Sequence, residues 1–310
     1  MRETNAPSWA HPYLLLTLAA LQWGANIVFG RLAVGQIAPM LLVSLRWAIV
    51  FVVLVAVYRD RLRVALHELR AHWSLLLLLA LTGYTGFTAF FYAAAHYTTG
   101  ANMAIIQGST PLFVFSLAFL AHGSRISRMQ GAGMVLALLG VACVATHGSL
   151  EAARHLTFNT GDLFMLAATA CYAIYTVWLA DRPKMDDIAF FAALAGVALV
   201  TSLPLTVIEM VQTPVLWPTW QGWLLTLLIA LFPSFLAQIF FMRGVASIGP
   251  GRAGIFVNLI PVFGAALSVL FLGEPFGWYQ TFGLALVMGG IVLAQKRLKQ
   301  PVPDTKIVRP

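Results

Sequence analysis

Ten long apolar runs constrain this chain more than any other feature of its sequence. They cover residues 12–31, 38–58, 73–95, 99–121, 129–147, 161–180, 187–208, 223–242, 251–272 and 277–295. Each run has about the 20 residues that an α-helix needs to cross the hydrocarbon core of a bilayer. Only 10% of the residues are charged, against about 25% in soluble domains. The sequence therefore predicts an all-α integral membrane protein with ten transmembrane helices.

The lysine and arginine residues alternate between the two sides of this predicted threading. If the N-terminus is cytoplasmic, sixteen of the nineteen cationic residues fall in cytoplasmic segments, as the positive-inside rule requires. Arg31 and Arg154 fall outside, and Arg46 lies within the second run. This distribution predicts cytoplasmic N- and C-termini in a bacterial inner membrane. It also explains the net charge of +8, so no nucleic-acid partner is expected.

The sequence carries no recognisable motif of a metal site, a cofactor site or an enzyme. Cys143 and Cys171 each lie inside an apolar run without paired spacing, which indicates small buried hydrophobic residues. Zinc-protease, hydrolase, P-loop and dinucleotide-binding patterns are all missing. No metal and no cofactor are expected, and ATP is not expected to drive the protein.

The second half of the sequence repeats the first at an offset of 150 residues, without a gap. Residues 73–143 align with 223–293, and the distinctive matches are Trp73 with Trp223, Pro111 with Pro261, Gly123 with Gly273, Gln130 with Gln280, Gly133 with Gly283 and Gly140 with Gly290. Each repeat has five helices, an odd number, so the second repeat must thread the membrane in the opposite sense. Such inverted repeats place a central cavity near the midplane in many transporters.

The repeat sets the expected boundaries of the chain. We expect a first five-helix repeat over 1–147, a periplasmic connecting loop over 148–160, a second five-helix repeat over 161–296, and a basic, disordered cytoplasmic tail over 297–310. No segment is long and polar enough to form a separate soluble domain.

Several short sequence patterns occur in a specific order along the chain. They are Trp23-Gly24-Ala25-Asn26, Leu45-Arg46-Trp47, Tyr92 through Ala101, Pro111, Gly161-Asp162, Tyr172-Ala173-Ile174-Tyr175, Arg243-Gly244-Val245-Ala246, Pro261 and Gly273-Glu274-Pro275. In this order they resemble the EamA family of the drug/metabolite transporter superfamily, from about residue 12 to 296. Within that family the chain resembles the YddG-type exporters of aromatic and other amino acids.

The resemblance implies a ten-helix bundle with a central cavity lined by the first four helices of each half. The fifth and tenth helices would lie at the periphery. The chain departs from the family pattern after the fourth run, where Ser124-Arg125 stand in place of a Glu-Pro-like turn. This departure weakens any role for the first-half turn and leaves the expected fold unchanged.

Two amides on the first helix are the leading candidates for a solute site. Gln22 and Asn26 are four residues apart and so share one helix face. Polar groups in membrane spans usually face a cavity or the bundle interior. Two interpretations stay open, because the amides could line a solute cavity or could form hydrogen bonds that join helices.

Aromatic residues accompany these amides in both halves. The candidates for solute contact are Trp23, Tyr84, Tyr92, Tyr172 and Tyr175, with Phe91, Trp178 and Phe235 nearby. As a set they would suit a solute with an apolar or aromatic side chain. Individually, each of them is equally compatible with an ordinary lipid-facing or interfacial position.

Pro111 and Pro261 lie in the middle of predicted spans at repeat-equivalent positions. Each removes a backbone donor and crowds the carbonyl four residues earlier. The pair predicts two kinks, and as hypotheses either hinges or freed carbonyls that bind solute. Gln107 and Asn258 lie beside the two prolines, and Gln238 lies on the eighth run. These three amides complete the predicted solute-binding set.

The sequence places no acidic residue in the middle of a span, since Asp162, Glu209 and Glu274 all lie near span ends. Exporters that couple cation efflux to protons usually need a buried carboxylate. His96 could titrate, although a hydrogen-bonded histidine at a loop edge is commoner. We therefore expect facilitated diffusion or exchange of a zwitterion. Arg46, Arg243 and Arg252 could meet a solute carboxylate, but Arg243 and Arg252 lie at the inner face, and we expect the deeper Arg46 to reach the interface or to pair.

The functional prediction is export of a small solute by alternating access, with amino acids favoured and aromatic or large apolar ones first. The expected partners are this solute and the lipid bilayer, in a monomer or a homodimer. One alternative is a proton-coupled drug or metabolite exporter. A remote alternative is a membrane-embedded lipid-modifying enzyme, for which His67 and His72 would be the candidate groups.

Overall fold

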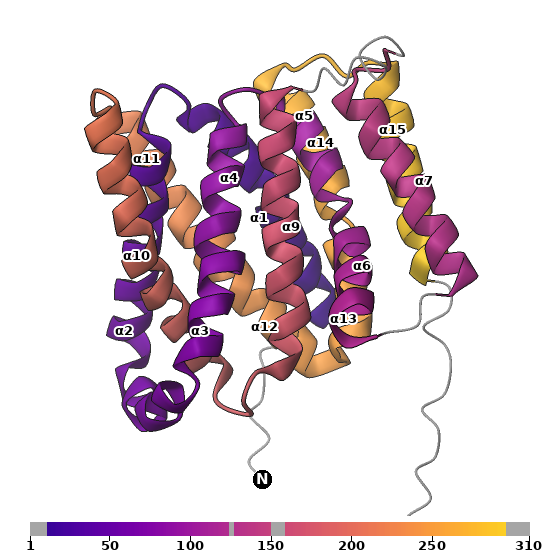
Figure 1. The fold of residues 1–310 in the computed structure, drawn as a ribbon. Coiled ribbons are helices and arrows are strands. Elements are labelled where there is room, and N and C mark those ends of the chain that lie inside the picture. Colours follow the sequence, from indigo (N-terminus) through magenta and orange to yellow (C-terminus); the bar gives the residue numbers. More distant parts are fainter. Residues whose placement is uncertain (1–10, 124–126, 150–158, 296–310) are drawn as a thin grey trace, which may run out of the picture.

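The computed structural model describes residues 11–123, 127–149 and 159–295, and every regular element in these ranges is helical (Figure 1). The helices are α1 (Pro12–Ala33), α2 (Pro39–Ala71), α3 (Trp73–Leu79), α4 (Phe87–Ala94), α5 (Gly100–Gln107), α6 (Thr110–His122), α7 (Arg128–Ala145), α9 (Thr160–Trp178), α10 (Asp187–Gln212), α11 (Trp220–Ile229), α12 (Ala237–Ile248), α13 (Pro250–Val257), α14 (Ile260–Leu272) and α15 (Trp278–Gln295), with π-helical turns η1 (Ala80–Gly86) and η3 (Ala230–Leu236) and the short turn η2 (Leu179–Asp181). Ser124 and Arg125, most of the connecting loop and the tail from 296 lie outside the described residues.

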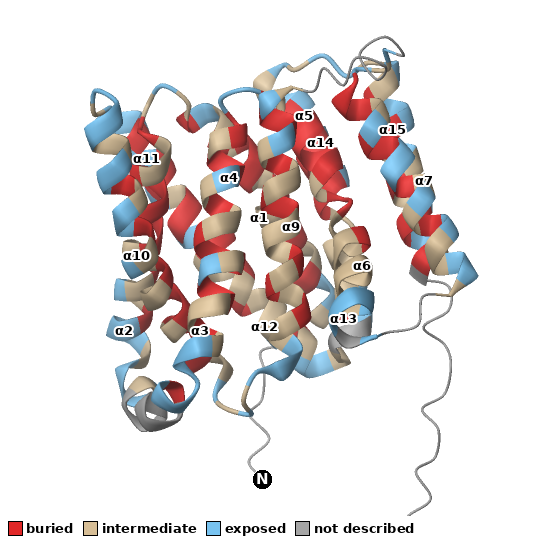
Figure 2. Ribbon diagram, viewed as in Figure 1, coloured by how far each residue is buried: buried red, intermediate tan, exposed pale blue. Residues whose placement is uncertain are grey.

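Lipid-facing surface surrounds this bundle. Within the described ranges, nine helical segments are long and apolar enough to cross a membrane, and Trp278–Ala294 is a shorter tenth. Buried residues concentrate where helices face one another (Figure 2). Large apolar residues such as Leu120 and Val211 are exposed. Exposed tryptophans stand at helix starts, at Trp73, Trp220 and Trp278, where amphipathic rings favour the membrane interface. The all-α integral membrane fold is confirmed.

The two halves repeat element by element at the offset of 150 residues. The π-helical turns η1 and η3 are related by this offset, as are α6 and α14 and the two long helices α7 and α15. The left-handed glycines that follow α6 and α14 are equivalent too, with φ of 64° at Gly123 and 63° at Gly273. A repeat detected from a few prolines and glycines therefore extends to the helix geometry.

Helices of each half pack on helices of the other half. The first helix of each half packs on the third and fourth helices of the other half, with α1 on α12 and α14, and α9 on α4 and α6. The second helices α2 and α10 pack on each other, and so do the fifth helices α7 and α15. α1 and α9 enter from opposite ends of the bundle (Figure 1). This arrangement confirms the inverted two-repeat fold.

The α7–α15 pair stands at the edge of the bundle and depends on glycine (Figure 1). A Cβ added at Gly140 would lie 2.7 Å from the carbonyl oxygen of Gly283, and one added at Gly283 would lie 3.0 Å from that of Gly140. Gly133 and Gly290 meet in the same way. Small residues let membrane helices approach closely, so the aligned glycines of the two repeats are the contact surface between them.

The second helix is longer than its apolar run. The run ends at residue 58, and residues 59–72 were expected to form a loop, whereas α2 continues to Ala71. Tyr58 interrupts the helical geometry with φ −123° and ψ 22°. The continuation is rich in arginine and leucine, which are good helix formers. The apolar run ends where the helix is expected to leave the membrane, but residues that favour a helix continue beyond that point.

The two ends of the bundle differ in charge. We call the end that carries Arg61, Arg182 and Arg243 the basic end. At the opposite end lie Arg31 and Glu274, whose Nε and Oε1 atoms are 3.3 Å apart. α1 begins and α15 ends at the basic end (Figure 1).

Candidate functional site

Several of the predicted solute-binding residues meet in one place. We define the central cluster as Asn26, Arg46, Trp47, Tyr84, Tyr92, Tyr172 and Tyr175, which come from α1, α2, η1, α4 and α9. Five of these seven residues were predicted from the sequence. Helices of both halves therefore contribute to the cluster, as an alternating-access site between repeats requires.

A short chain of hydrogen bonds crosses the cluster. Arg46 donates from Nη1 to the hydroxyl of Tyr92 at 2.7 Å, and that hydroxyl donates to Oδ1 of Asn26 at 2.9 Å. All three residues are at least 94% buried. Asn26 therefore joins helices, which is one of the two interpretations left open by its sequence position. Its contact with solute stays a prediction.

Aromatic rings continue from this chain toward the basic end. The ring of Tyr84 lies 4.7 Å from Trp47 and 5.7 Å from Tyr175, and Tyr175 lies 5.4 Å from Tyr172. Tyr175 fits because it packs directly on Gly83, which has no side chain. Tyr84 and Gly83 both belong to η1, and π-helical turns commonly occur at functional sites in helical proteins.

The other predicted residues lie elsewhere on the path between the halves. Trp23 donates from Nε1 to the carbonyl of Pro233 in η3 at 3.0 Å. Gln22 donates to the carbonyl of Leu18 on its own helix, and its buried Oε1 has no partner among the described residues. Gln238 is half-buried on α12. The structure does not bring these three residues into the central cluster.

The two prolines mark breaks in the fourth and ninth spans. α5 ends at Gln107 and α13 ends at Val257, the residues whose carbonyls Pro111 and Pro261 were expected to crowd. The predicted kinks are confirmed, while a hinge motion stays a prediction. Gln107 has a buried Oε1 without a partner in the described part of the chain, and Asn258 is half-buried beside the second break.

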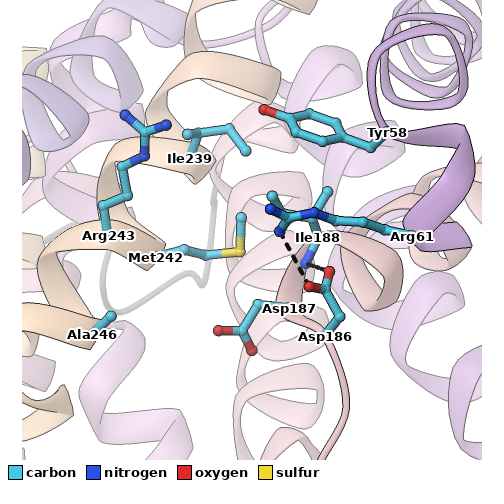
Figure 3. Close-up of a pocket in the computed structure, with 9 residues that line it drawn as sticks. All are labelled: Tyr58, Arg61, Asp186, Asp187, Ile188, Ile239, Met242, Arg243 and Ala246. Atoms are coloured by element: carbon cyan, nitrogen blue, oxygen red, sulfur yellow. Dashed lines mark hydrogen bonds and ion pairs between the residues drawn. The ribbon is translucent and has the colours of Figure 1, made fainter. Parts of the chain in front are cut away.

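A cavity of about 340 Å³ lies at the basic end, between α2, α10 and α12 (Figure 3). Arg61 and Asp186 form an ion pair at its wall, with Nη1 and Oδ2 3.2 Å apart. Tyr58 and Met242 also face it. Its wall therefore combines apolar side chains with charges of both signs, which suits the passage of a zwitterion.

A smaller cavity of about 220 Å³ lies at the opposite end. Arg31, His96, His147 and Asn159 line it, with the threonines of the α4–α5 connection. Partial desolvation and the nearby charge of Arg31 lower the pKa of His96, so His96 is neutral at pH 7. This lowered pKa disfavours His96 as a proton carrier near neutrality.

Two carboxylates join helices at the opposite end. Glu274 accepts hydrogen bonds from the backbone N–H groups of Gly100 (2.9 Å) and Ala101 (3.1 Å) while it pairs with Arg31. Asp162, expected near a span end, is fully buried in the first turn of α9 and accepts from the hydroxyl of Thr98 at 2.6 Å. Its second oxygen has no hydrogen-bond partner among the described residues.

The predicted solute-binding set did not include two members of the central cluster, Arg46 and Trp47. Arg46 was expected to reach the interface or to pair, but it is 5% exposed and has no ion-pair partner in the described residues. It cannot reach the interface because its helix face packs against the bundle. The available signal was its depth, since Arg46 lies near the middle of an otherwise apolar run.

Comparisons with known proteins agree with this geometry. The EamA-like transporter family matches residues 11–146 and 159–295. The uncharacterized transporter YyaM of Bacillus subtilis (strain 168) is 25% identical over 95% of this chain and 96% of its own length. A probable amino-acid metabolite efflux pump of Salmonella typhimurium (strain LT2) is 26% identical over 90% of this chain and 93% of its own length.

A solved crystal structure with 21% identity covers 93% of this chain and 99% of its own, with a TM-score of 0.62, which shows a shared fold. The relatives are named as transporters and pumps, so the enzyme alternative is not retained. The family match spans both halves and coincides with the two helical repeats. The chain is thus a multi-pass membrane transporter and belongs to the EamA-like transporter family.

Proposed function

We propose that this transporter exports amino acids, with aromatic or large apolar ones preferred, by alternating access. The observation that carries the proposal is the central cluster, where Tyr92 joins one amide and one guanidinium and a row of aromatic rings connects them to tyrosines of the second half. Aromatic rings bind apolar side chains by stacking and by apolar contact, and polar groups fix the orientation of a small ligand. The Salmonella relative is named for amino-acid metabolite efflux.

The two cavities suggest a path for the solute through the protein. The basic end, with Arg61, Arg182 and Arg243, faces the cytoplasm of a bacterial cell if the positive-inside rule holds. The 340 Å³ cavity then receives the solute from the cytoplasm, and the 220 Å³ cavity lies on the exit side. The central cluster lies between them along α2 and α4. Rocking of one half against the other would expose the cluster to each cavity in turn.

Transport by purified protein in proteoliposomes tests this proposal. We expect counterflow of labelled phenylalanine, tyrosine, leucine or methionine that needs no pH gradient. Asn26→Ala and Gln22→Ala should each reduce this flux without lowering expression. Normal flux in both variants would remove the first helix from the site, and no flux of any amino acid by the wild type would refute the proposal.

Asp162 favours one competing mechanism, proton-coupled export of a drug or metabolite. It is a fully buried carboxylate with one oxygen that lacks a partner among the described residues, and such groups carry protons in many transporters. If a pH gradient stimulates flux in the wild type and fails to stimulate it in Asp162→Asn, the coupled mechanism replaces the facilitator. Equal flux with and without the gradient supports the facilitator.

A further inference from the structure

Arg46 places a positive charge in the centre of the bundle without an acidic partner among the described residues. Its side chain is 5% exposed. Its guanidinium donates to Tyr92 at 2.7 Å and lies 4.8 Å from the ring centre of Trp47 and 5.6 Å from that of Tyr92. Aromatic faces attract a cation but do not neutralise it. A buried charge without a counter-charge is costly, so the guanidinium of Arg46 favours binding of an anion.

The unsatisfied atoms at this site are all hydrogen-bond donors. Nε of Arg46 and Nε1 of Trp47 are both buried, and neither has an acceptor in the described part of the chain. Arginine and tryptophan side chains donate and never accept. Two neighbouring residues of α2 therefore present free donors beside a positive charge. A group that satisfies either donor must be an acceptor, and a negative acceptor would also neutralise the charge of Arg46.

Arg46 cannot recruit its counter-charge from the cavity at the basic end. Tyr58, which lines that cavity, follows Arg46 by twelve residues on the same helix, about 18 Å along its axis. Val50 and Leu54 lie between them at intervals of four residues and are 1% and 0% exposed. The charge is therefore separated from that cavity by packed apolar side chains. Only a ligand that reaches the central cluster can meet it.

We propose that Arg46 and Trp47 bind the carboxylate of the transported solute, and that its apolar side chain packs along Tyr84, Tyr172 and Tyr175. Guanidinium groups match carboxylates in shape and charge. The proposal rests on the proposed function and narrows its substrate class to small monocarboxylates with an apolar or aromatic side chain. The carboxylate is the obligatory recognition element, and the amino group is secondary.

Solute analogues test this proposal on the unaltered full-length protein. The probes are L-phenylalanine, its amide, 3-phenylpropionate and phenethylamine, each added to purified protein while its thermal stability is measured in a chloride-free buffer and with added chloride. We expect phenylalanine and 3-phenylpropionate to stabilise the protein and the amide and the amine to bind about tenfold more weakly or worse. Equal stabilisation by phenylalanine and its amide overturns the proposal while leaving amino-acid export intact.

Two further outcomes of this experiment also test the carboxylate proposal. If none of the four probes stabilises the protein, this proposal fails, and the counterflow of leucine and methionine decides the proposed function separately. If chloride stabilises as strongly as 3-phenylpropionate, the site takes an inorganic anion, and the carboxylate proposal fails alone.

Variants separate solute recognition from a structural role of Arg46. Arg46→Lys keeps the charge and loses the planar fork, and Arg46→Gln loses both. We expect Arg46→Gln to abolish the preference for phenylalanine over its amide, and Arg46→Lys to retain part of it. Arg59→Gln is the matched control, because Arg59 lies on the same helix with a side chain 69% exposed. A folded Arg46→Gln that keeps the wild-type preference would overturn the proposal.

Discussion

The hydroxyl of Tyr92 holds three helices together at a single point. It accepts from Arg46 on α2 and donates to Asn26 on α1. Tyr92→Phe keeps the ring and removes both hydrogen bonds, which leaves a buried guanidinium without its hydroxyl acceptor. We expect a loss of about 1–3 kcal/mol in the free energy of unfolding, measured as a lower melting temperature in detergent, together with slower counterflow.

Tyr13→Phe is the control for this change. Tyr13 lies on α1 with 45% of its surface exposed, so loss of its hydroxyl should leave the melting temperature unchanged. Equal melting temperatures of Tyr92→Phe and the wild type would show that the hydroxyl contributes no net stability.

At the residue scale, the sequence predicted which side chains lie inside the bundle better than it predicted their hydrogen-bond partners. The spacing of Gln22 and Asn26 places both amides on one face, yet only Asn26 meets another helix in the structure. Which of the two amides forms a hydrogen bond to another helix depends on where that helix packs. Contacts between residues far apart in the sequence determine this packing. The same limit applies to Arg46, whose burial depends on the helices that pack on α2, α4 among them.

At the element scale, the α7–α15 pair can be tested through its glycines. Gly140→Val introduces a side chain where even a Cβ would lie 2.7 Å from a backbone oxygen. A backbone cannot move aside as a flexible side chain can, so we expect a cost of about 1–3 kcal/mol from overpacking. Gly131→Val on the same helix is the control, because a Cβ at Gly131 meets nothing within 4 Å. Similar melting temperatures for the two variants would contradict this packing.

The two helix breaks should respond differently to loss of their prolines. In the first half, the hydroxyls of Ser109 and Thr110 donate to the carbonyls of Ile106 and Gln107, each at 2.6 Å. The equivalent residues in the second half are Leu259 and Ile260, which have no hydroxyl. In Pro261→Ala, the restored N–H can bond to the carbonyl of Val257 and heal the helix.

We therefore expect Pro261→Ala to slow transport more than Pro111→Ala, because the first break keeps its hydroxyl caps. Hydrogen exchange should become slower around residues 258–262 in Pro261→Ala and change little around 108–112 in Pro111→Ala. Equal effects on flux and on exchange would show that the hydroxyls do not maintain the first break.

The elements themselves were largely predictable, and their irregularities were only partly so. Apolar length gave the spans, and the prolines gave the two breaks. The π-helical turns η1 and η3 were not predictable, because η1 contains no proline and a π turn changes hydrogen bonding without changing hydropathy. Tyr84 takes its position from η1, so this part of the central cluster was accessible only from coordinates.

At the scale of the whole molecule, the odd number of helices in each repeat was sufficient to predict inverted threading. The exchange of partners between the halves was not predictable, since α1 and α9 carry little amphipathic character to show which neighbour they prefer. This exchange has a functional consequence. Because α1 packs on α12 and α14, movement of one half changes contacts at both ends of the bundle.

A carboxylate contact at the opposite end has no equivalent in the first repeat of the sequence. Glu274 joins Arg31 of α1 to the start of α5, whereas its repeat equivalent is Ser124. The carboxylate after α14 therefore has no counterpart in the sequence after α6, although the Arg61–Asp186 ion pair joins α2 to the start of α10 at the basic end. We expect this asymmetry to favour the state in which the opposite end is closed and the cavity at the basic end is accessible.

Glu274→Gln should weaken this closure, because a neutral amide loses the ion pair and one strong acceptor. A charge-assisted hydrogen bond contributes about 1.5–3 kcal/mol, so the open population should rise on the order of tenfold or more. Spin labels at the exposed residues Leu32 and Phe276 should report a longer, broader distance distribution in the variant. Asp60→Asn, which removes an exposed carboxylate on α2, should leave the distribution unchanged. If Glu274→Gln leaves it unchanged as well, the carboxylate of Glu274 does not set the balance between the two states.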